Sequence, residues 1–250
     1  MKPWTTIARE KAPDGAELML QQRDGEFSIR ANGWVLMTSR ITGSEKALAQ
    51  ATCSRLPAEA KVLVGGLGMG FTLRAALDCL GRHGRVVVAE LTPAVVAWNR
   101  GPLGPLTGHP LNDQRVEIFN GDVRQAWKEL SPFDAILLDV DNGPNALTLP
   151  GNQTLYSRAA MSEGYQALRA KGVLGVWSIG PAPAFLERLR GVGFVPERQV
   201  VKGGQHELLL GWKQGARRGN KAWTRPAPRI KEAVRDSLEP RAPGHRRRRR

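Results

Sequence analysis

The chain has 250 residues, of which 41% are hydrophobic and 24% charged, a globular composition long enough for one sizeable core and a small appendage. No stretch approaches the roughly 18 uninterrupted apolar residues of a membrane span, and the charges in residues 1–17 do not suit a signal peptide, so we expect a cytoplasmic protein without membrane contact. Two cysteines, Cys53 and Cys79, are too few for a disulfide framework and lack metal-ligand spacing, so we expect no metal.

The basic residues are concentrated at the C-terminal end of the chain. The formal net charge is +14, and 14 basic but only 3 acidic residues follow from Gly211 onward. Residues 215–250 are rich in proline, arginine and glycine and finish with five arginines, which repel one another and bury nothing. We expect a disordered tail there, acting either as a solubilising extension or as a weak nucleic-acid contact through charge alone.

Two further parts precede this tail. Residues 17–38 alternate polar and apolar side chains around the turn signals Asp24-Gly25 and Asn32-Gly33, which predicts a small antiparallel β-subdomain. A helix is expected at 44–54 with Ser44 as its N-cap. We therefore expect an N-terminal β-subdomain with a linking helix over residues 1–56 and a nucleoside-binding domain over 57–214.

From Lys61 the pattern changes to short apolar runs that alternate with helical segments. This alternation predicts a parallel sheet, closed by a hairpin of residues 194–201 and 206–212 that adds antiparallel strands. The fold class is therefore α/β, with a doubly wound, mostly parallel seven-stranded sheet. The other strands are expected at 62–64, 85–89, 116–119, 135–138 and 173–177, and the helices at 71–80, 92–99, 123–130, 156–168 and 184–190.

A glycine-rich loop follows the first of these strands. Residues 65–70 read GGLGMG and lead into a helix, which is the context of a nucleotide-binding loop with glycines at Gly66, Gly68 and Gly70. The dinucleotide fingerprint and the phosphate-binding P-loop do not fit. Glu90 ends the next strand, where a carboxylate can bind ribose hydroxyls, and Asp122 follows the third strand, where it can accept from an adenine amino group. The alternatives are a tight turn without ligand, a solvated strand end at Glu90 and a helix cap at Asp122.

Two carboxylates follow the fourth strand. Asp139 and Asp141 lie where open α/β sheets bind ligands, beyond the carboxyl ends of the strands, and would attract a cationic substrate. An Asx turn is the alternative. Histidines are scattered and no hydrolase elbow is found, so metal and triad catalysis have no support. The tryptophans are expected to pack in the core or at its rim: Trp34, Trp98, Trp127 and Trp177.

With these motifs in order, residues 26–212 resemble the spermidine synthase family of polyamine aminopropyltransferases, which has the fold of the class I S-adenosylmethionine-dependent methyltransferases. The resemblance rests on residues 29–40, the glycine loop, Glu90, the strand end from Asp139 to Pro144 and the segment 156–174. It implies that the nucleoside cofactor, S-adenosylmethionine or its decarboxylated form, contacts the following residues: Gly65, Gly66, Gly68, Gly70, Glu90, Leu91, Asp122, Val123 and Asp139.

The resemblance also implies catalytic roles and departures from the family pattern. Asp139 would orient and deprotonate an amine acceptor, and the N-terminal strands would form a homodimer. The second acid of the family's strand end is replaced by Asn142, but the charge of Asp141, one residue earlier, suggests that it pairs with the far ammonium of a diamine. Gly68 stands where family members carry an acid that favours decarboxylated S-adenosylmethionine, and the family's Tyr-His-Glu appears only as Gly43-Ser-Glu45.

Three functional hypotheses follow. The first is a spermidine synthase-like transferase that moves an aminopropyl group from decarboxylated S-adenosylmethionine to a small-molecule amine. The second is an S-adenosylmethionine-dependent methyltransferase of a small molecule or RNA, suggested by Gly68 and the basic tail. The third is a non-catalytic binding protein whose tail contacts nucleic acid.

Overall fold

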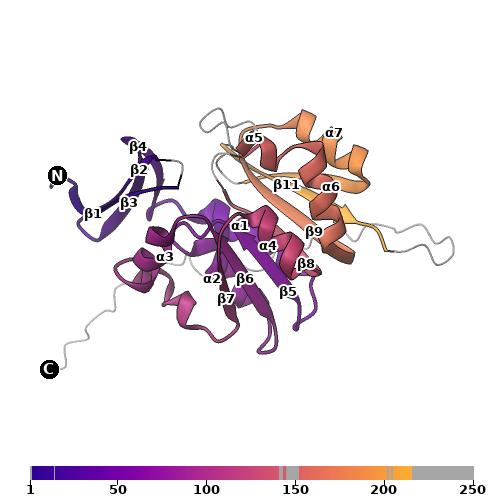
Figure 1. Cartoon of the computed structure of the whole chain (residues 1–250), viewed down its shortest axis with the longest axis horizontal. Coiled ribbons are helices and arrows are strands. Elements are labelled where there is room, and N and C mark those ends of the chain that lie inside the picture. The colour runs from indigo at the N-terminus through magenta and orange to yellow at the C-terminus, as the bar shows by residue number, and fades with distance from the viewer. Residues whose placement is uncertain are drawn as a thin grey trace, which may run out of the picture. The chain divides into compact units, whose positions relative to one another are not determined.

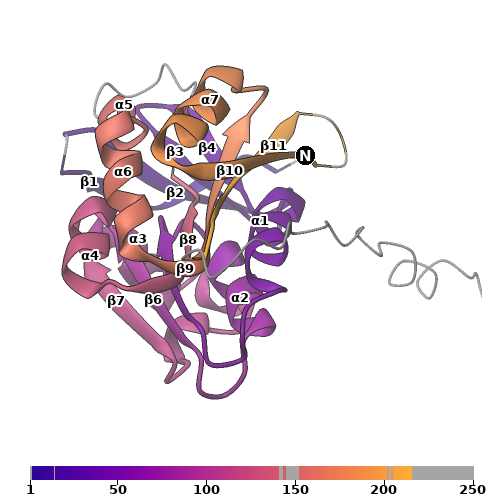
Figure 2. The same cartoon turned by 90° about the vertical axis from the view of Figure 1, so that its right-hand side faces the viewer.

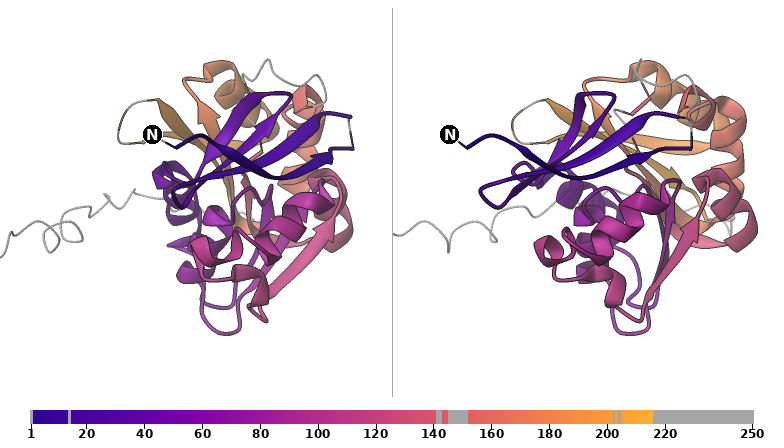
Figure 3. Two further views of the ribbon diagram at one scale, coloured as in Figure 1. Left: turned by 90° about the vertical axis from the view of Figure 1, so that its left-hand side faces the viewer. Right: turned by 60° about the vertical axis from the view of Figure 1, so that its left-hand side comes forward.

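The computed structural model describes residues 2–13, 15–140, 143–144, 152–201, 203 and 205–215. A separate four-stranded antiparallel sheet is formed by consecutive strands near the N-terminus: β1 (Thr5–Lys11), β2 (Glu17–Arg23), β3 (Glu26–Ala31) and β4 (Trp34–Thr38). Its strands form a twisted layer (Figure 3). Asp24, Gly25, Asn32 and Gly33 all have positive φ, which confirms the two tight turns read from the sequence.

Strand β1 is absent from the sequence prediction. It pairs with β2 from Thr5 to Lys11, yet five of its seven residues are charged or polar and most are exposed, so its alternation is too weak to recognise. The strand is held by its neighbour's backbone instead of by a buried face. The prediction of a β-subdomain is confirmed, with one more strand than expected.

The central sheet has seven strands in the order β10-β11-β9-β8-β5-β6-β7 (Figure 1). The five strands from β7 to β9 are parallel to one another, whereas β10 and β11 are antiparallel, as the hairpin signal predicted. The bounds are β5 (Lys61–Gly65), β6 (Arg85–Glu90), β7 (Val116–Asn120), β8 (Phe133–Leu138), β9 (Leu168–Ile179), β10 (Phe194–Val200) and β11 (His206–Lys213).

Helices cover both faces of this sheet (Figure 2). Successive residues of a strand face opposite sides of the sheet and so contribute to two separate hydrophobic cores. Val62 and Val64 of β5 pack with α1 to α3, while Leu63 packs with α4, α6 and α7 on the other side. The helices are α1 (Gly43–Cys53), α2 (Phe71–Cys79), α3 (Pro93–Arg100), α4 (Val123–Leu130), α5 (Asn152–Leu155), α6 (Arg158–Ala167) and α7 (Pro183–Val192), with short 3₁₀ turns η1 (Gly104–Thr107) and η2 (Pro110–Asn112). This confirms the predicted fold class.

The order of strands creates a switch point next to β5. The chain runs from β5 through β6 to β7 on one side and then crosses to β8 and β9 on the other. In open α/β sheets ligands bind at this point, beyond the carboxyl ends of the strands. The glycine loop after β5 and Asp139 after β8 both border it.

Two helix predictions need correction. Helix α1 begins at Gly43, so Ser44 lies inside the first turn and its hydroxyl bonds to Glu45 instead of capping the helix. The expected helix at 156–168 is observed as α6 but is shorter, because the side chain of Ser157 caps it by accepting from the Ala160 amide, so the helix begins at Arg158 and ends at Ala167.

Smaller expectations have mixed outcomes. Cys53 is buried and Cys79 is half-buried, and both thiols are free. Trp34 was expected to pack in the core or at its rim, but it is 79% exposed on β4, at the edge of its sheet. No helix of the described residues is long and apolar enough to cross a membrane. Except for Gly215, the expected tail lies outside the described residues.

Candidate active site

The glycine loop between β5 and α2 is shaped by three residues in the left-handed region. Gly66, Gly68 and Gly70 have φ values of 86°, 51° and 82°. A Cβ at Gly66 would lie 2.5 Å from the backbone oxygen of Asp139, so only glycine permits this approach. The Asp139 amide also donates to the Gly65 oxygen at 2.9 Å. The loop is thus fitted directly against the end of β8.

Glu90, the last residue of β6, is only 8% exposed. Its Oε2 accepts a hydrogen bond from the Leu67 amide at 2.9 Å, and its Oε1 accepts one from the Thr92 amide at 2.8 Å. Burial raises the pKa of this carboxyl, and the amide donors oppose the rise. The alternative of a solvated strand end is therefore wrong. A ribose contact stays a prediction, and it would use the remaining lone pairs of the carboxylate.

Asp122 is the N-cap of α4, because its Oδ1 accepts from the Arg124 amide at 2.7 Å. This confirms the cap reading, and an adenine contact through Oδ2 stays a prediction. Val123 is buried, and a Cβ at Gly65 would lie 2.7 Å from its Cγ2. Leu91 is 54% exposed and immediately follows Glu90, so it offers apolar surface at the strand end.

Two contacts to the loop have no sequence signal. The side-chain amide of Asn99, on α3, donates to the Gly68 oxygen at 2.8 Å. The sulfur of Met37, on β4, occupies the space beside Gly68, since a Cβ there would lie 2.9 Å from it. The space beside Gly68 is therefore filled by a thioether from the N-terminal sheet.

Asp139 follows β8 and is half-buried. Its Oδ2 accepts from the Thr72 hydroxyl, on α2, at 2.5 Å. Burial raises the pKa of Asp139 to about 7, and the charge of Glu45 adds to the rise, while Thr72 opposes it. Among the described residues, neither Asp139 nor Glu45 has a Lys, Arg or His partner within 4.0 Å.

Glu45 and Thr72 were not predicted as site residues. Glu45 lies in the first turn of α1, is 9% exposed, and accepts from the Ser44 hydroxyl at 2.7 Å. Thr72 is the second residue of α2, which begins immediately after the glycine loop. Asp141, the second predicted catalytic carboxylate, lies outside the described residues, and its role stays a prediction.

This arrangement suits a neutral or cationic nucleoside and an amine. The loop offers close backbone approach, Glu90 offers a carboxylate at the adjacent strand end, and Asp139 offers a proton acceptor near neutral pH. Within the described part of the chain, no three His, Cys, Asp or Glu side chains gather in a way that could hold a metal ion.

Comparison with solved structures identifies the fold. Spermidine synthase from Thermotoga maritima matches with a TM-score of 0.68 and 20% identity, over 84% of this chain and 74% of that one. A spermidine synthase in complex with the transition-state analogue AdoDATO matches at 0.71 and 20% identity, with the same shares. A probable spermidine synthase from Corynebacterium glutamicum ATCC 13032 matches at 0.61 and 16% identity, over 85% of this chain and 81% of that one.

Sequence comparison adds a second similarity. The profile of the protein-L-isoaspartate(D-aspartate) O-methyltransferase family matches residues 37–149. No curated protein sequence matches the chain. The protein therefore has the spermidine synthase-like fold of the class I S-adenosylmethionine-dependent methyltransferases, as the sequence motifs predicted.

Proposed function

We propose that this protein transfers an aminopropyl group from decarboxylated S-adenosylmethionine to a small amine. The observation that carries the proposal is the half-buried carboxylate of Asp139, which adjoins the glycine loop and has no cationic partner among the described residues. A carboxylate that is partly withdrawn from water without a partner is unfavourable unless a cation pairs with it or a proton neutralises it. An amine acceptor, which arrives protonated, supplies both.

The reaction requires positioning and one proton acceptor. The acceptor nitrogen forms a bond to the carbon beside the sulfonium, the bond from that carbon to sulfur breaks, and sulfur leaves as a neutral thioether with the electron pair. The ammonium must first lose a proton, which Asp139 accepts. Because the pKa of Asp139 is about 7, a substantial fraction is ionised at neutral pH and is more basic than an ordinary aspartate.

Thr72 contributes orientation in this scheme. Its hydroxyl holds Oδ2 of Asp139, which leaves Oδ1 to face the acceptor. The backbone amide of Asp139 is in turn bonded to Gly65 of the loop. The proton acceptor and the nucleoside-binding loop are therefore fixed relative to each other, as a displacement in line with the leaving sulfur needs.

A second candidate is methyl transfer from intact S-adenosylmethionine to a small molecule or RNA. The observation that favours it is Gly68, which carries no acid to repel the carboxylate of the intact cofactor, while Met37 fills the adjacent space. The similarity to a methyltransferase family over residues 37–149 points the same way.

Calorimetric titration of the full chain with the two forms of the cofactor separates these candidates. Aminopropyl transfer predicts that the decarboxylated form binds at least tenfold more tightly, about 1.4 kcal/mol, and that 1,4-diaminobutane is converted to spermidine. Preference for the intact form, with methyl but no aminopropyl transfer, would replace the first proposal by the second. Binding of neither form would reject both.

A matched pair of variants then tests the role of Asp139. Asp139→Asn should abolish turnover while cofactor affinity stays within about twofold, because the loop contacts use the backbone of residue 139. Asp78→Asn, an exposed carboxylate on α2 that pairs with Arg74, should retain full turnover. Equal activity of Asp139→Asn and the wild type would reject Asp139 as the proton acceptor.

A further inference from the structure

The amino ends of the parallel strands lie on the side of the central sheet away from the candidate active site. The glycine loop and Asp139 follow the carboxyl ends of β5 and β8. Lys61 and Arg85, in contrast, are the first residues of β5 and β6 and pair with each other across the sheet. We call the three segments that meet at this side the amino-end surface: residues 54–61, 81–85 and 169–172.

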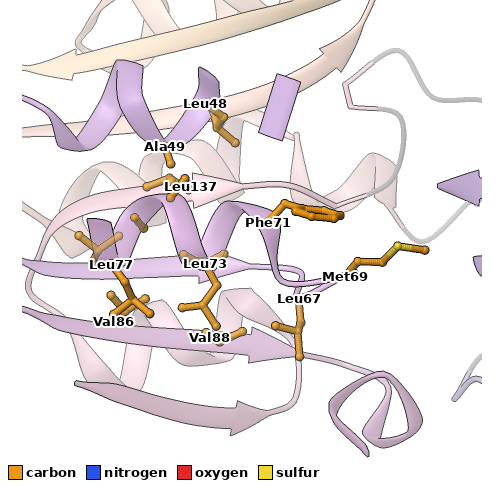
Figure 4. Packing of buried hydrophobic residues seen from close by; sticks show 14 of the residues in the cluster. Leu48, Ala49, Leu67, Met69, Phe71, Leu73, Leu77, Val86, Val88 and Leu137 are labelled. Atoms are coloured by element: carbon orange, nitrogen blue, oxygen red, sulfur yellow. The ribbon is translucent and has the colours of Figure 1, made fainter. Parts of the chain in front are cut away.

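Helix α2 connects the glycine loop to the amino-end surface. Figure 4 shows Leu77 beside Val86, near the start of β6, while Phe71, the first residue of α2, lies at the opposite end of the helix. The turn after α2 is joined to the turn before β5, because the Gly81 amide donates to the Ala58 oxygen at 2.8 Å. Two of the three segments are therefore fixed side by side.

Three exposed arginines belong to these two segments. Arg55 follows α1, and its guanidinium carbon lies 5.7 Å from the ring centroid of Trp212. Arg82 lies in the turn after α2, and Arg85 donates to the Gln114 oxygen at 3.3 Å. Within the described residues, none of the three arginines has an acidic partner within 4.0 Å. Their charges are thus available to an external anion.

The third segment is a bulge at the start of β9. Phe133 of β8 pairs with Leu168, whereas Ala135, two residues later, pairs with Val173. Residues 169–172 are the extra residues between these two pairs, so they are not matched to the neighbouring strand. Such a bulge redirects side chains at the end of a strand.

The bulge adds a fourth unpaired cation and is joined to the basic tail. Arg169 pairs with Asp134 at 2.5 Å, but Lys171 is exposed and forms no ion pair with a described residue. Gly215 packs beside Lys171, because a Cβ at this glycine would lie 3.5 Å from Cε of the lysine. The residues that follow, 216–250, contain 13 basic and 3 acidic side chains.

The charge and composition of the amino-end surface suit a phosphate backbone. Its four unpaired cations outnumber the unpaired acids beside it, which are Glu59 and Glu129. Three of the four are arginines, whose planar guanidinium binds phosphate oxygens in pairs. None of the large hydrophobic side chains in these segments is exposed, so the apolar contact that helps proteins to bind a membrane surface is missing.

The dimensions also agree with nucleic acid. From β9 through β8 and β5 to β6 there are three strand spacings, which is about 14 Å. One strand of a B-form duplex carries about four phosphates over this length. A rigid row of cations can therefore contact several successive phosphates at once.

We propose that the amino-end surface binds the sugar-phosphate backbone of a nucleic acid. This inference goes beyond the proposed reaction and does not depend on it, because Asp139 lies at the other end of the strands. Binding is independent of base sequence, since backbone contacts carry no sequence information. The charge of residues 216–250 adds to the affinity, whereas the amino-end surface supplies phosphate contacts at fixed positions.

Salt-dependent binding of the full chain to a labelled DNA duplex, measured by fluorescence anisotropy, tests the proposal. The double variant Arg82→Gln/Lys171→Gln removes two cations from the amino-end surface. Its slope of log affinity against log salt should be smaller by about 2, and its affinity at about 0.1 M salt should fall at least tenfold. The matched control, Arg40→Gln/Lys46→Gln, removes two exposed, unpaired cations near the start of α1 and should change neither value.

Several outcomes would overturn the proposal. These are a wild type that does not bind the duplex, an unchanged slope in the amino-end variant, and equal losses in both double variants. If the amino-end variant loses binding to phosphatidylserine vesicles but keeps binding to DNA, the surface serves a membrane instead. Aminopropyl transfer is measured on the same samples, so loss of either proposal is visible separately from the other. Far-ultraviolet circular dichroism verifies that each variant is folded.

Discussion

Replacement of Asp139 by asparagine should make the protein more stable at alkaline pH. The carboxyl titrates near 3.8 in an unfolded chain and at about 7 in the folded protein. Below about pH 4 the group is protonated in both states and its contribution to stability is fully present. Between about pH 4 and pH 7 the unfolded chain ionises this carboxyl while the folded state keeps its proton, so that stability is lost progressively, and no further loss follows above the folded pKa of about 7.

The size of the effect follows from the same values. A rise from 3.8 to about 7 corresponds to about 4 kcal/mol at about 1.4 kcal/mol per pKa unit, and this is an upper limit because Asp139 keeps some exposed surface. About 2–3 kcal/mol of it should appear between pH 5 and pH 8. The asparagine amide oxygen can still accept from the Thr72 hydroxyl, so that hydrogen bond need not be lost.

Urea unfolding at the two pH values measures this difference. The free energy of unfolding of Asp139→Asn, minus that of the wild type, should increase by about 2 kcal/mol or more from pH 5 to pH 8. The Asp78→Asn variant, whose carboxylate is largely exposed, should show a much smaller change. A pH-independent difference for Asp139→Asn would refute the claim that this carboxyl is ionised at an energetic cost.

Four other results are expected. Gly66→Ala should destabilise the fold by about 2 kcal/mol or more in urea unfolding, because its Cβ would meet backbone at 2.5 Å; a neutral effect would contradict the loop geometry. Gly68→Asp should shift calorimetric preference toward decarboxylated S-adenosylmethionine only together with Met37→Ala, which removes the sulfur 2.9 Å from the new Cβ. Glu90→Gln should reduce stability by about 1–3 kcal/mol and weaken cofactor binding, since an amide cannot accept from two N–H groups on opposite sides; unchanged melting and affinity would refute this. If the tail over residues 216–250 contacts nucleic acid by charge, log affinity of the full chain for duplex DNA should fall steeply with log salt, and a flat dependence would exclude it.

The parts of the site that lie within one strand and its following loop could be predicted from the sequence. β5, the glycine loop and α2 are contiguous, and Glu90 ends the next strand, so local pattern and spacing were sufficient. The hydrogen bonds that the Glu90 carboxylate accepts were not predictable from the sequence, because a carboxylate at a strand end can face either solvent or backbone amides. Its burial depends on how the loop folds back over β6.

The remaining residues meet only through tertiary packing. Met37 reaches Gly68 from a different sheet, and Asn99 reaches it from α3, in each case across about 31 residues of sequence. Glu45 comes near Asp139 because α1 packs over β9, and no periodicity in either segment encodes this crossing. The start of α6 was placed two residues too early for a local reason, since Ser157 next to helix-forming residues is a weak signal of an N-cap.

The two hydrogen bonds that backbone amides donate to Glu90 also bear on the thermodynamics of ligand binding. They join the glycine loop and the start of α3 to one buried carboxylate, so the loop has its shape before any nucleoside arrives. A binding site that is already ordered loses little conformational entropy when it is filled. Nucleoside binding to this protein should therefore proceed with a small heat-capacity change, set by the apolar area that the ligand covers and not by folding of the loop.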